Sequence, residues 1–402
     1  MKRLALVVLV GCGAPAHPAP RSAAPRGDDI TLYRDVAVIR QRIELDLPAA
    51  TTMKTVKVAA GVRASQLVVV DKADLDVVLR APTDGTTDDK PVEITLDVTA
   101  RHAGHYTIVL AYLTDRLDWN VAYTMTANAT RQRAQVRGAL AIFNTTGLPI
   151  HAGSARVIDA ELGTWRTKTS EALAAALISG TSSSTPPAQP RELGSLDLGE
   201  GETRVELVGA TTLQMSSVLV YDPIGTKLDH AGPSPLTDPV LGITPPAPGR
   251  VTESFEITRD KAQSAGLPAG PVRLLDSRPD GSLAVLGEAS LYDASTRVGD
   301  IDTIPVGTAE GVTGSRERRE LTVEDSKRIV EEFVITIENK RDYPVRVLLR
   351  EHLYRGQNWV IAYPQSDPDA KKEGPQQFSM RRNVPARSQT KILYVVVYTW
   401  GQ

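Results

Sequence analysis

Most of the chain alternates apolar and polar residues with a period of two, which predicts half-buried β-strands. The alternation is clear at residues 39–47, where charged side chains fall on one face and Ile or Leu predominates on the other. It recurs at residues 92–99, 333–337 and 345–349. Strands with one apolar and one polar face belong to antiparallel sheets that cover a core on one side. We therefore predict antiparallel strands at all four places.

The last strand-like segment, residues 391–400 (KILYVVVYTW), is apolar on both faces and favours a central position in a β-sandwich. Turn signals at residues 82–85 (PTDG) and 279–281 (PDG) predict hairpins, because glycine there allows a positive φ. Many short strands with turns between them, and no long crossover helices, predict an all-β fold. The expected architecture is a series of tandem antiparallel β-sandwich modules of immunoglobulin-like type.

Only one stretch has a helical pattern. Ser170 can cap residues 171–178 (EALAAALI), and the Ser/Pro-rich run at 179–190 that follows has no core-forming side chains. We predict that residues 166–194 form an exposed insertion with one short helix. Residues 229–249 hold six prolines and are predicted to form a loop.

The N-terminus resembles that of a secreted bacterial lipoprotein. A basic start precedes seven apolar residues at 4–10, about the minimum for a secretory signal and far shorter than the ~20 residues of a membrane-spanning helix. Leu9-Val10-Gly11-Cys12 resembles a lipobox, in which the signal is cut before a cysteine that is then acylated. We predict a signal peptide at 1–11 and a lipid anchor, with palmitate among its acyl chains, on Cys12. The alternative is a chance cysteine after an ordinary signal, or a short buried strand.

The segment after the cysteine predicts a tether. Residues 12–29 are rich in Pro, Ala and Gly and lack apolar periodicity, so they cannot build a core. Gly13 after the cysteine resembles lipoproteins that are sorted to an outer membrane. We expect a lipid-anchored envelope protein, held at the outer membrane, with an N-terminal β domain at 30–104 and a second β region at 105–402.

Composition and motifs narrow the chemistry. Lys and Arg number 46 against 48 Asp and Glu, which argues against a nucleic-acid partner because that affinity needs a clustered positive field. No nucleophile elbow, zinc-protease helix or phosphate-binding loop occurs. Of six scattered histidines, His102 and His105 lie three apart, on opposite faces of a strand, so no metal site is predicted. We predict no cofactor.

Three charged stretches have plausible roles. The acidic run at 71–76 lacks the Gly and distal Glu of a calcium loop, so a solvated loop is expected. Asp300 and Asp302 could share one strand face, the minimum for acid–base work on sugars. The run at 316–320 (RERRE) mixes both signs and is typical of a solvated edge strand.

Four segments in order carry a family resemblance: residues 111–125 (AYLTDRLDWNVAYTM), 138–147 (GALAIFNTTG), 267–288 (LPAGPVRLLDSRPDGSLAVLGE) and the closing LYVVVYTW. Together they resemble a bacterial envelope family of unknown function whose best-named members are the mucoidy-inhibitor-A-like proteins. The likeness covers roughly residues 30–402. It implies an all-β body, secretion and no assigned enzymatic activity. The chain departs from the usual pattern at residues 148–150 and in the Ser/Pro-rich insertion.

The aromatic residues of these segments are interpreted as structural. Trp119 and Tyr123 are four apart, so they share one face of a strand and could close one end of a sandwich, and Trp400 belongs to the closing strand. The leading hypothesis is a non-enzymatic envelope lipoprotein that acts as a binding or structural module on a protein or polysaccharide. The alternative is an envelope hydrolase of glycans or peptides, which would be favoured if Asp300, Asp302 and Glu288 met in a deep pocket.

Overall fold

The chain is all-β, as predicted. The computed structural model describes residues 27–62, 67–80, 90–162, 189–225, 228, 230, 232, 236–243, 249–259, 267–278, 280–292, 297–298, 301–324, 327–364 and 367–400. Strands make up 70% of the structure, and no α-helix occurs among the described residues. The predicted helix at 171–178 and the predicted hairpin at 82–85 lie outside them.

Two smaller sheets belong to the N-terminal half of the chain. One has six strands, in the order β11 (Arg191–Leu198), β10 (Ile150–Val157), β1 (Asp28–Leu32), β2 (Ala37–Leu47), β7 (Gly104–Thr114) and β4 (Val68–Asp71). The other has three, in the order β3 (Thr51–Val58), β6 (Val92–Thr99) and β5 (Asp76–Arg80).

A 14-stranded sheet runs through the rest of the molecule. Its main path is β15 (Leu283–Leu291), β14 (Gly270–Ser277), β8 (Leu117–Ala127), β9 (Arg133–Asn144), β12 (Gly201–Tyr221), β13 (Gly249–Thr258), β17 (Ile301–Glu324), β18 (Arg328–Asn339), β23 (Ser388–Thr399) and β20 (Trp359–Tyr363). Off this path, β16 (Arg297–Val298) pairs with β17, β19 (Val345–His352) pairs with β12 and β22 (Gln377–Val384), and β21 (Ala370–Lys372) pairs with β22.

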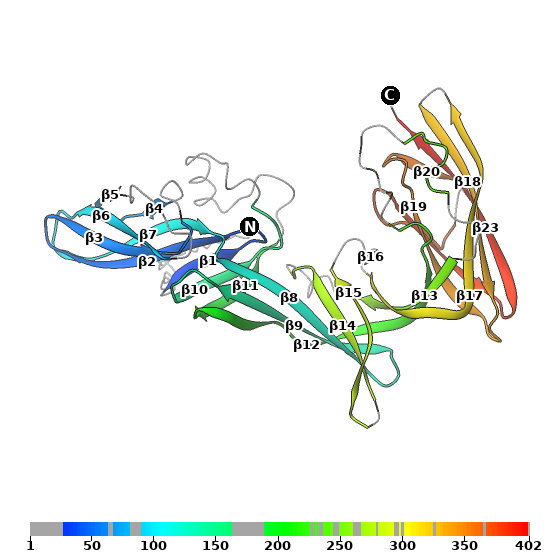
Figure 1. Cartoon of the computed structure of the whole chain (residues 1–402), viewed down its shortest axis with the longest axis horizontal. Coiled ribbons are helices and arrows are strands. Elements are labelled where there is room, and N and C mark those ends of the chain that lie inside the picture. Colours follow the sequence, from blue (N-terminus) through cyan, green and yellow to red (C-terminus); the bar gives the residue numbers. More distant parts are fainter. Residues whose placement is uncertain are drawn as a thin grey trace, which may run out of the picture.

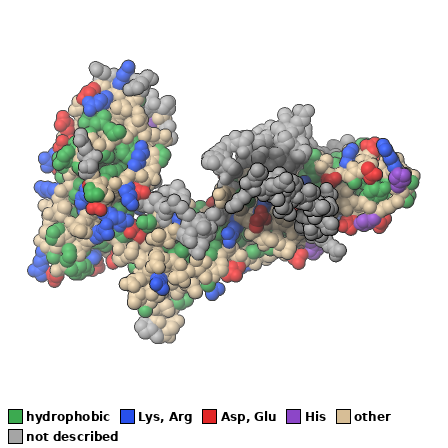
Figure 2. Space-filling view, turned by 180° about the vertical axis from the view of Figure 1, so that it is seen from behind, with side chains coloured by type: hydrophobic (Ala, Val, Ile, Leu, Met, Phe, Trp, Pro, Cys, Tyr) green, Lys and Arg blue, Asp and Glu red, His purple; other side chains and the backbone are tan. Residues whose placement is uncertain are grey.

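Two long strands join the halves of the molecule. β12 has 21 residues and pairs with β9 along its first part, then with β13 and β19 at its end. β17 has 24 residues and pairs first with β13 and then with β18. Figure 1 shows the result, an elongated, bent molecule with β1–β11 in one lobe and β18–β23 in the other. On the face seen in Figure 2, basic and acidic side chains are interspersed over both lobes.

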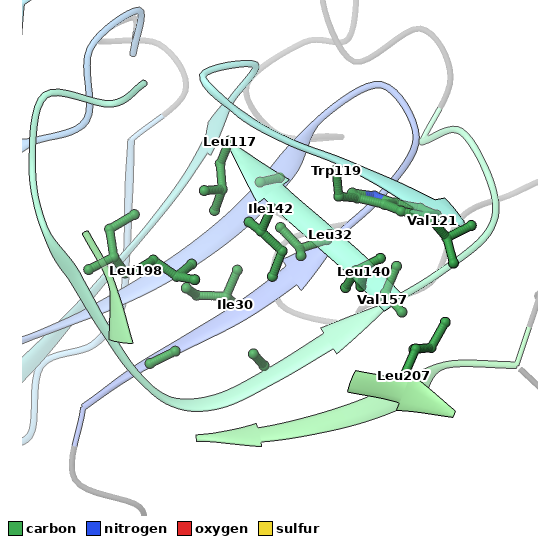
Figure 3. Close-up of a cluster of buried hydrophobic side chains, with 14 of the residues drawn as sticks. Ile30, Leu32, Leu117, Trp119, Val121, Leu140, Ile142, Val157, Leu198 and Leu207 are labelled. Carbon is green, nitrogen blue, oxygen red and sulfur yellow. The ribbon is translucent and has the colours of Figure 1, made fainter. Parts of the chain in front are cut away.

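Each lobe has its own core. The N-terminal core combines strands of all three sheets; Figure 3 shows Ile30 and Leu32 of β1 near Trp119 of β8 and Ile142 of β9. The C-terminal core lies between β17, β18 and β23 on one side and β19 and β22 on the other. The predicted alternation is confirmed, since Phe333, Ile335 and Ile337 are fully buried every second residue along β18.

The two lobes repeat one arrangement of strands, here called the N-terminal module (β1, β8–β11 and the first part of β12) and the C-terminal module (the end of β12, β17–β19, β22 and β23). In the first, β8, β9 and β12 are antiparallel, and β10 pairs parallel to β1 and antiparallel to β11. In the second, β17, β18 and β23 are antiparallel, and β19 pairs parallel to β12 and antiparallel to β22. β12 therefore serves both modules.

One asparagine closes each module in the same way. Asn144 ends β9 and Asn339 ends β18. The Asn144 amide donates to the Leu198 carbonyl at the end of β11 (3.0 Å), and the Asn339 amide donates to the Val384 carbonyl at the end of β22 (3.2 Å). Both side chains also bond to the main chain two and four residues later. Both open the motif N-x-x-x-x-P-[IV], whose last residue begins β10 or β19.

Several boundaries differ from the predictions or sharpen them. Residues 191–194, assigned to the exposed insertion, begin β11, because their alternation continues a strand that pairs with β10. The expected division at 104/105 falls at the first residue of β7, which pairs along its length with β2. The predicted hairpin around Gly281, whose φ is +81°, connects β14 and β15. The closing strand β23 is central, as predicted, with β18 and β20 on its two sides.

Candidate functional site

The predicted aromatic residues are packed inside the molecule. Trp119 and Tyr123 are both buried on the inner face of β8. The Trp119 indole donates to the Tyr33 carbonyl (2.8 Å), and the Tyr123 hydroxyl donates to the Pro268 carbonyl (2.8 Å). Trp400 is half-buried against the C-terminal core. Cys12, the predicted lipidation site, lies outside the described residues.

A salt bridge between Arg34 and Asp159 connects Trp119 of β8 with the LPAG segment at 267–270. Arg34, between β1 and β2, forms an ion pair with Asp159 (2.6 Å) and lies 4.2 Å above the ring centroid of Trp119. The same guanidinium donates to the Ala269 carbonyl (2.7 Å), and the Ala269 N–H donates to Asp159 (2.5 Å). The LPAG segment at 267–270 is therefore fastened to the N-terminal module, which gives these residues a structural role.

The acidic residues that would favour a hydrolase do not form one site among the described residues. Glu288 is exposed and pairs with Arg273 (2.7 Å), whereas Asp302 is buried and pairs with Arg259 (3.1 Å). Asp300 lies outside the described residues. In the part of the chain that the structure describes, no cluster of His, Cys, Asp and Glu could hold a metal ion. His105 instead contacts two exposed carboxylates, Glu44 and Asp46.

The most unusual site is a charged segment that the sequence analysis missed. Residues 350–355 (REHLYR) are all buried although four of the six are ionisable at ordinary pH as Arg, Glu or His. They form the end of β19 and the residues that follow it. Because side chains alternate along a strand, Glu351 points into the C-terminal core, while Arg350 and His352 lie on the other side of the layer. Two clusters result, here called the inner cluster and the outer cluster.

The inner cluster begins with Arg316 of β17. Its guanidinium pairs with Glu351 (2.8 Å) and lies 3.8 Å above the Phe333 ring, and Tyr394 donates a hydrogen bond to Glu351 (2.6 Å). Burial acts to lower the pKa of Arg316, but the charge of Glu351 together with the interactions of Tyr394 and Tyr354 outweighs it and holds this pKa above its ordinary value. Burial, reinforced by Glu351, raises the pKa of Tyr394. The arginine is thus a permanent cation and the tyrosine a permanent donor.

A second carboxylate, Glu331 of β18, completes the inner cluster. It is fully buried and pairs with Arg355 (2.9 Å) and Arg318 (3.2 Å), and it accepts a hydrogen bond from Tyr354 (3.3 Å). The two carboxylates and three arginines of the inner cluster come from β17, β18 and the 350–355 segment. This geometry compensates the buried charges, which is the condition for burying them at all.

The arginines also hold residues 236–243, here called the strap. Arg316 donates to the Gly242 carbonyl (2.8 Å), and Arg318 donates to the Leu241 carbonyl (3.0 Å). Arg355 donates to the Leu236 carbonyl (2.6 Å). Since the donors bind main-chain oxygens, the strap is held by its backbone. Its side chains Val240 and Ile243 remain exposed.

The run at 316–320 was therefore only partly predicted. The run begins after Gly314, the last residue of β17 that pairs with β13. From there on, one edge of β17 is no longer paired with β13. The prediction that it is solvated is wrong, however, because Arg316 is only 4% exposed. Arg316 and Arg318 face inward, and alternation leaves Glu317 and Arg319 in solvent.

The outer cluster lies on the opposite side of β19. It consists of Arg350 and His352 of β19, Asp222 after β12, Glu256 of β13 and Arg381 of β22. Arg381 forms an ion pair with Glu256, and His352 lies 3.5 Å from Asp222. Burial alone raises the pKa of Asp222, but the hydrogen bond and charge of His352, with smaller contributions from the Gly225 N–H and the charge of Arg350, bring that pKa below its usual value. The outer cluster thus joins side chains of β13, β19 and β22 with Asp222, and three of its five members (Arg350, His352 and Glu256) are buried.

No protein-family model matches the chain, and no curated protein matches it. No helix among the described residues is long and apolar enough to cross a membrane. The charged segment could have been noticed from the sequence by one signal. At 350–355, ionisable residues occupy both faces of a strand that is apolar on both faces just before, at 347–349.

Proposed function

We propose that this chain is a non-enzymatic lipoprotein of the bacterial cell envelope, anchored through Cys12 and resembling the mucoidy-inhibitor-A-like proteins. The repeated modules are proposed to be tandem immunoglobulin-like β-sandwiches. The repeat of strand order and asparagine closure in both lobes supports this architecture. A shared strand such as β12 suits a rigid arm that holds one module away from the anchor.

The outer cluster is the observation that carries a binding function. Four of its five charged or titratable side chains come from β13, β19 and β22, and the fifth is Asp222, which follows β12; the fold brings them together on one side of the C-terminal module. Exposed Arg346 lies two strand steps before Leu348 on this side. The arginines of the inner cluster, by contrast, donate hydrogen bonds to the carbonyl groups of the strap. We infer that a protein or polysaccharide of the envelope binds at the outer cluster.

Site-specific crosslinking tests this function. A photo-crosslinking residue in place of Arg346 should capture one glycan polymer or one protein from intact membranes. The matched control is the same residue in place of exposed Arg137 on β9 of the N-terminal module. Equal capture at both positions, or none at position 346, contradicts a binding surface at the outer cluster.

A separate variant tests the anchor. Cys12→Ala should move the protein from the detergent phase to the aqueous phase, because the thiol that carries the lipid is gone. The crosslinking site is unaffected by this change, so the two tests are independent. Retention of the variant in the detergent phase overturns the lipobox interpretation.

A further inference from the structure

Arg350 is a buried arginine whose guanidinium keeps hydrogen-bond donors without a partner. Its exposed fraction is 7%, yet it forms no ion pair with any carboxylate of the described residues. Its Nη2 donates to the Thr303 hydroxyl (3.3 Å), and its buried Nε has no hydrogen-bond partner. Burial lowers the pKa of the guanidinium. A buried charge without a partner is costly, and proteins normally pair it.

The nearby carboxylates are all engaged elsewhere. Glu256 pairs with Arg381, and Asp222 accepts from the Gly225 N–H (2.8 Å) besides facing His352. Glu373 accepts a hydrogen bond from the Ser379 hydroxyl (3.0 Å). None of these acids forms an ion pair with Arg350, although their charges act on its guanidinium, so its unsatisfied N–H donors are left for an oxyanion.

The setting also limits the charge of that oxyanion. Among the described residues, the charges of Asp222, Glu256 and Glu373 act on Arg350 and favour its charged form, so a multiply charged group meets more repulsion there than a singly charged one. A guanidinium with free N–H groups matches the planar, bidentate geometry of a carboxylate. The Thr303 hydroxyl can supply a further hydrogen bond. We propose that Arg350 and Thr303 hold a single carboxylate group of the partner; this inference rests on the binding function proposed above.

Acetate is the probe for this site. The melting temperature of the protein should rise with the concentration of sodium acetate, at an ionic strength kept constant with sodium chloride, because a ligand that binds only the folded state stabilises it. Arg350→Met should abolish the rise, and Arg350→Lys, which keeps the charge but loses the planar fork, should reduce it. The matched control is Arg346→Met, on the same strand but exposed, which should keep the full rise.

Three results overturn the carboxylate site: no rise in the wild-type protein, an equal rise in Arg350→Met, or a larger rise with inorganic phosphate than with acetate. Arg350→Met removes an unpaired buried charge and is expected to fold; its melting temperature without acetate reports whether it does, and Arg350→Lys provides a second variant. Partner capture at position 346 without an acetate effect overturns the carboxylate site alone. An acetate effect without partner capture overturns the binding function and supports the site.

Discussion

The N-terminal and C-terminal modules share their strand order and their asparagine closure but differ in what fills the interior. Counted from the closing asparagine, Val136 on β9 corresponds to Glu331 on β18. The strand neighbours differ likewise. Val121 pairs with Leu140, four residues before Asn144, whereas Arg316 pairs with Ile335, four residues before Asn339. The same backbone arrangement therefore accommodates an apolar core in one lobe and an ionic one in the other.

The difference has a physical consequence. The hydrophobic effect is non-directional, so Val121 and Val136 contribute to stability with any neighbouring side chain that excludes water from them. A buried ion pair gains little net free energy over apolar residues, but it is directional, and its unused donors demand partners. In the C-terminal module those donors reach the carbonyls of the strap at 236–243. The ionic interior thus fixes the path of the strap through its main-chain carbonyl groups.

Removal of one buried carboxylate should give the largest difference in stability between the two modules. Glu331→Gln leaves Arg355 and Arg318 buried without a full counterion, so unfolding free energy should fall by about 3–5 kcal/mol. Val136→Ala at the corresponding apolar position should cost about 2 kcal/mol from lost burial and a small cavity. Urea unfolding of both variants measures the two losses. Similar losses would mean that the two interiors are energetically alike.

A double substitution sharpens the same point. Glu351→Leu alone leaves Arg316 unpaired in the core and should destabilise by about 3–5 kcal/mol, whereas Arg316→Met combined with Glu351→Leu should recover most of that loss. A double-mutant cycle in urea gives the coupling. Additive losses would show that Arg316 does not depend on Glu351 for compensation.

Removal of the closing asparagine should lower the unfolding free energy by the same amount in both lobes. Asn144→Ala and Asn339→Ala each remove several hydrogen bonds to main-chain groups, so each should lower the unfolding free energy by about 2–3 kcal/mol. The measurement is urea unfolding, with Asn128→Ala, in the exposed turn after β8, as a control of small effect. A large loss at only one of the two closing positions contradicts the structural repeat.

A smaller effect is expected where the LPAG segment meets the N-terminal module. Tyr123→Phe removes the hydrogen bond to the Pro268 carbonyl but keeps the ring, so the expected loss is about 1 kcal/mol. Tyr106→Phe, whose exposed hydroxyl bonds to the His102 carbonyl, is the matched control and should be close to neutral. Thermal unfolding of the two variants separates them; equal stability would mean that the buried bond contributes nothing.

The smallest expected effect depends on pH. The pKa of Asp222 is lowered by His352 in the folded state, so its contribution is present above the unfolded value of 3.8 and is lost as the pH falls through the folded value. Wild-type protein should therefore lose its advantage over Asp222→Asn below a pH of about 4, and keep it at a pH of about 6. Acid unfolding curves check this. A difference that stays constant across the range contradicts the pairing with His352.

Much of the fold could be predicted from local pattern. The strands at 39–47, 92–99, 333–337 and 345–349 were expected because a half-buried strand exposes every second residue, and this leaves a period of two. The burial of Trp119 and Tyr123 on one face follows from the same spacing. The candidate site could not be predicted in this way, because Glu331, Arg316 and Arg355 are far apart in the chain and each has ordinary neighbours.

The sequence by itself determined the all-β character, the apolar faces and the turn at Gly281, since these depend on residues close along the chain. The motif N-x-x-x-x-P-[IV] was present twice, but only the shared bonds of Asn144 and Asn339 show that it closes two equivalent modules. Tertiary structure alone decided whether a charge is solvated or buried. Arg319 and Arg316 are three residues apart with the same chemistry, yet one faces water and the other faces Glu351, because pairing with β18 fixes which side of β17 each occupies.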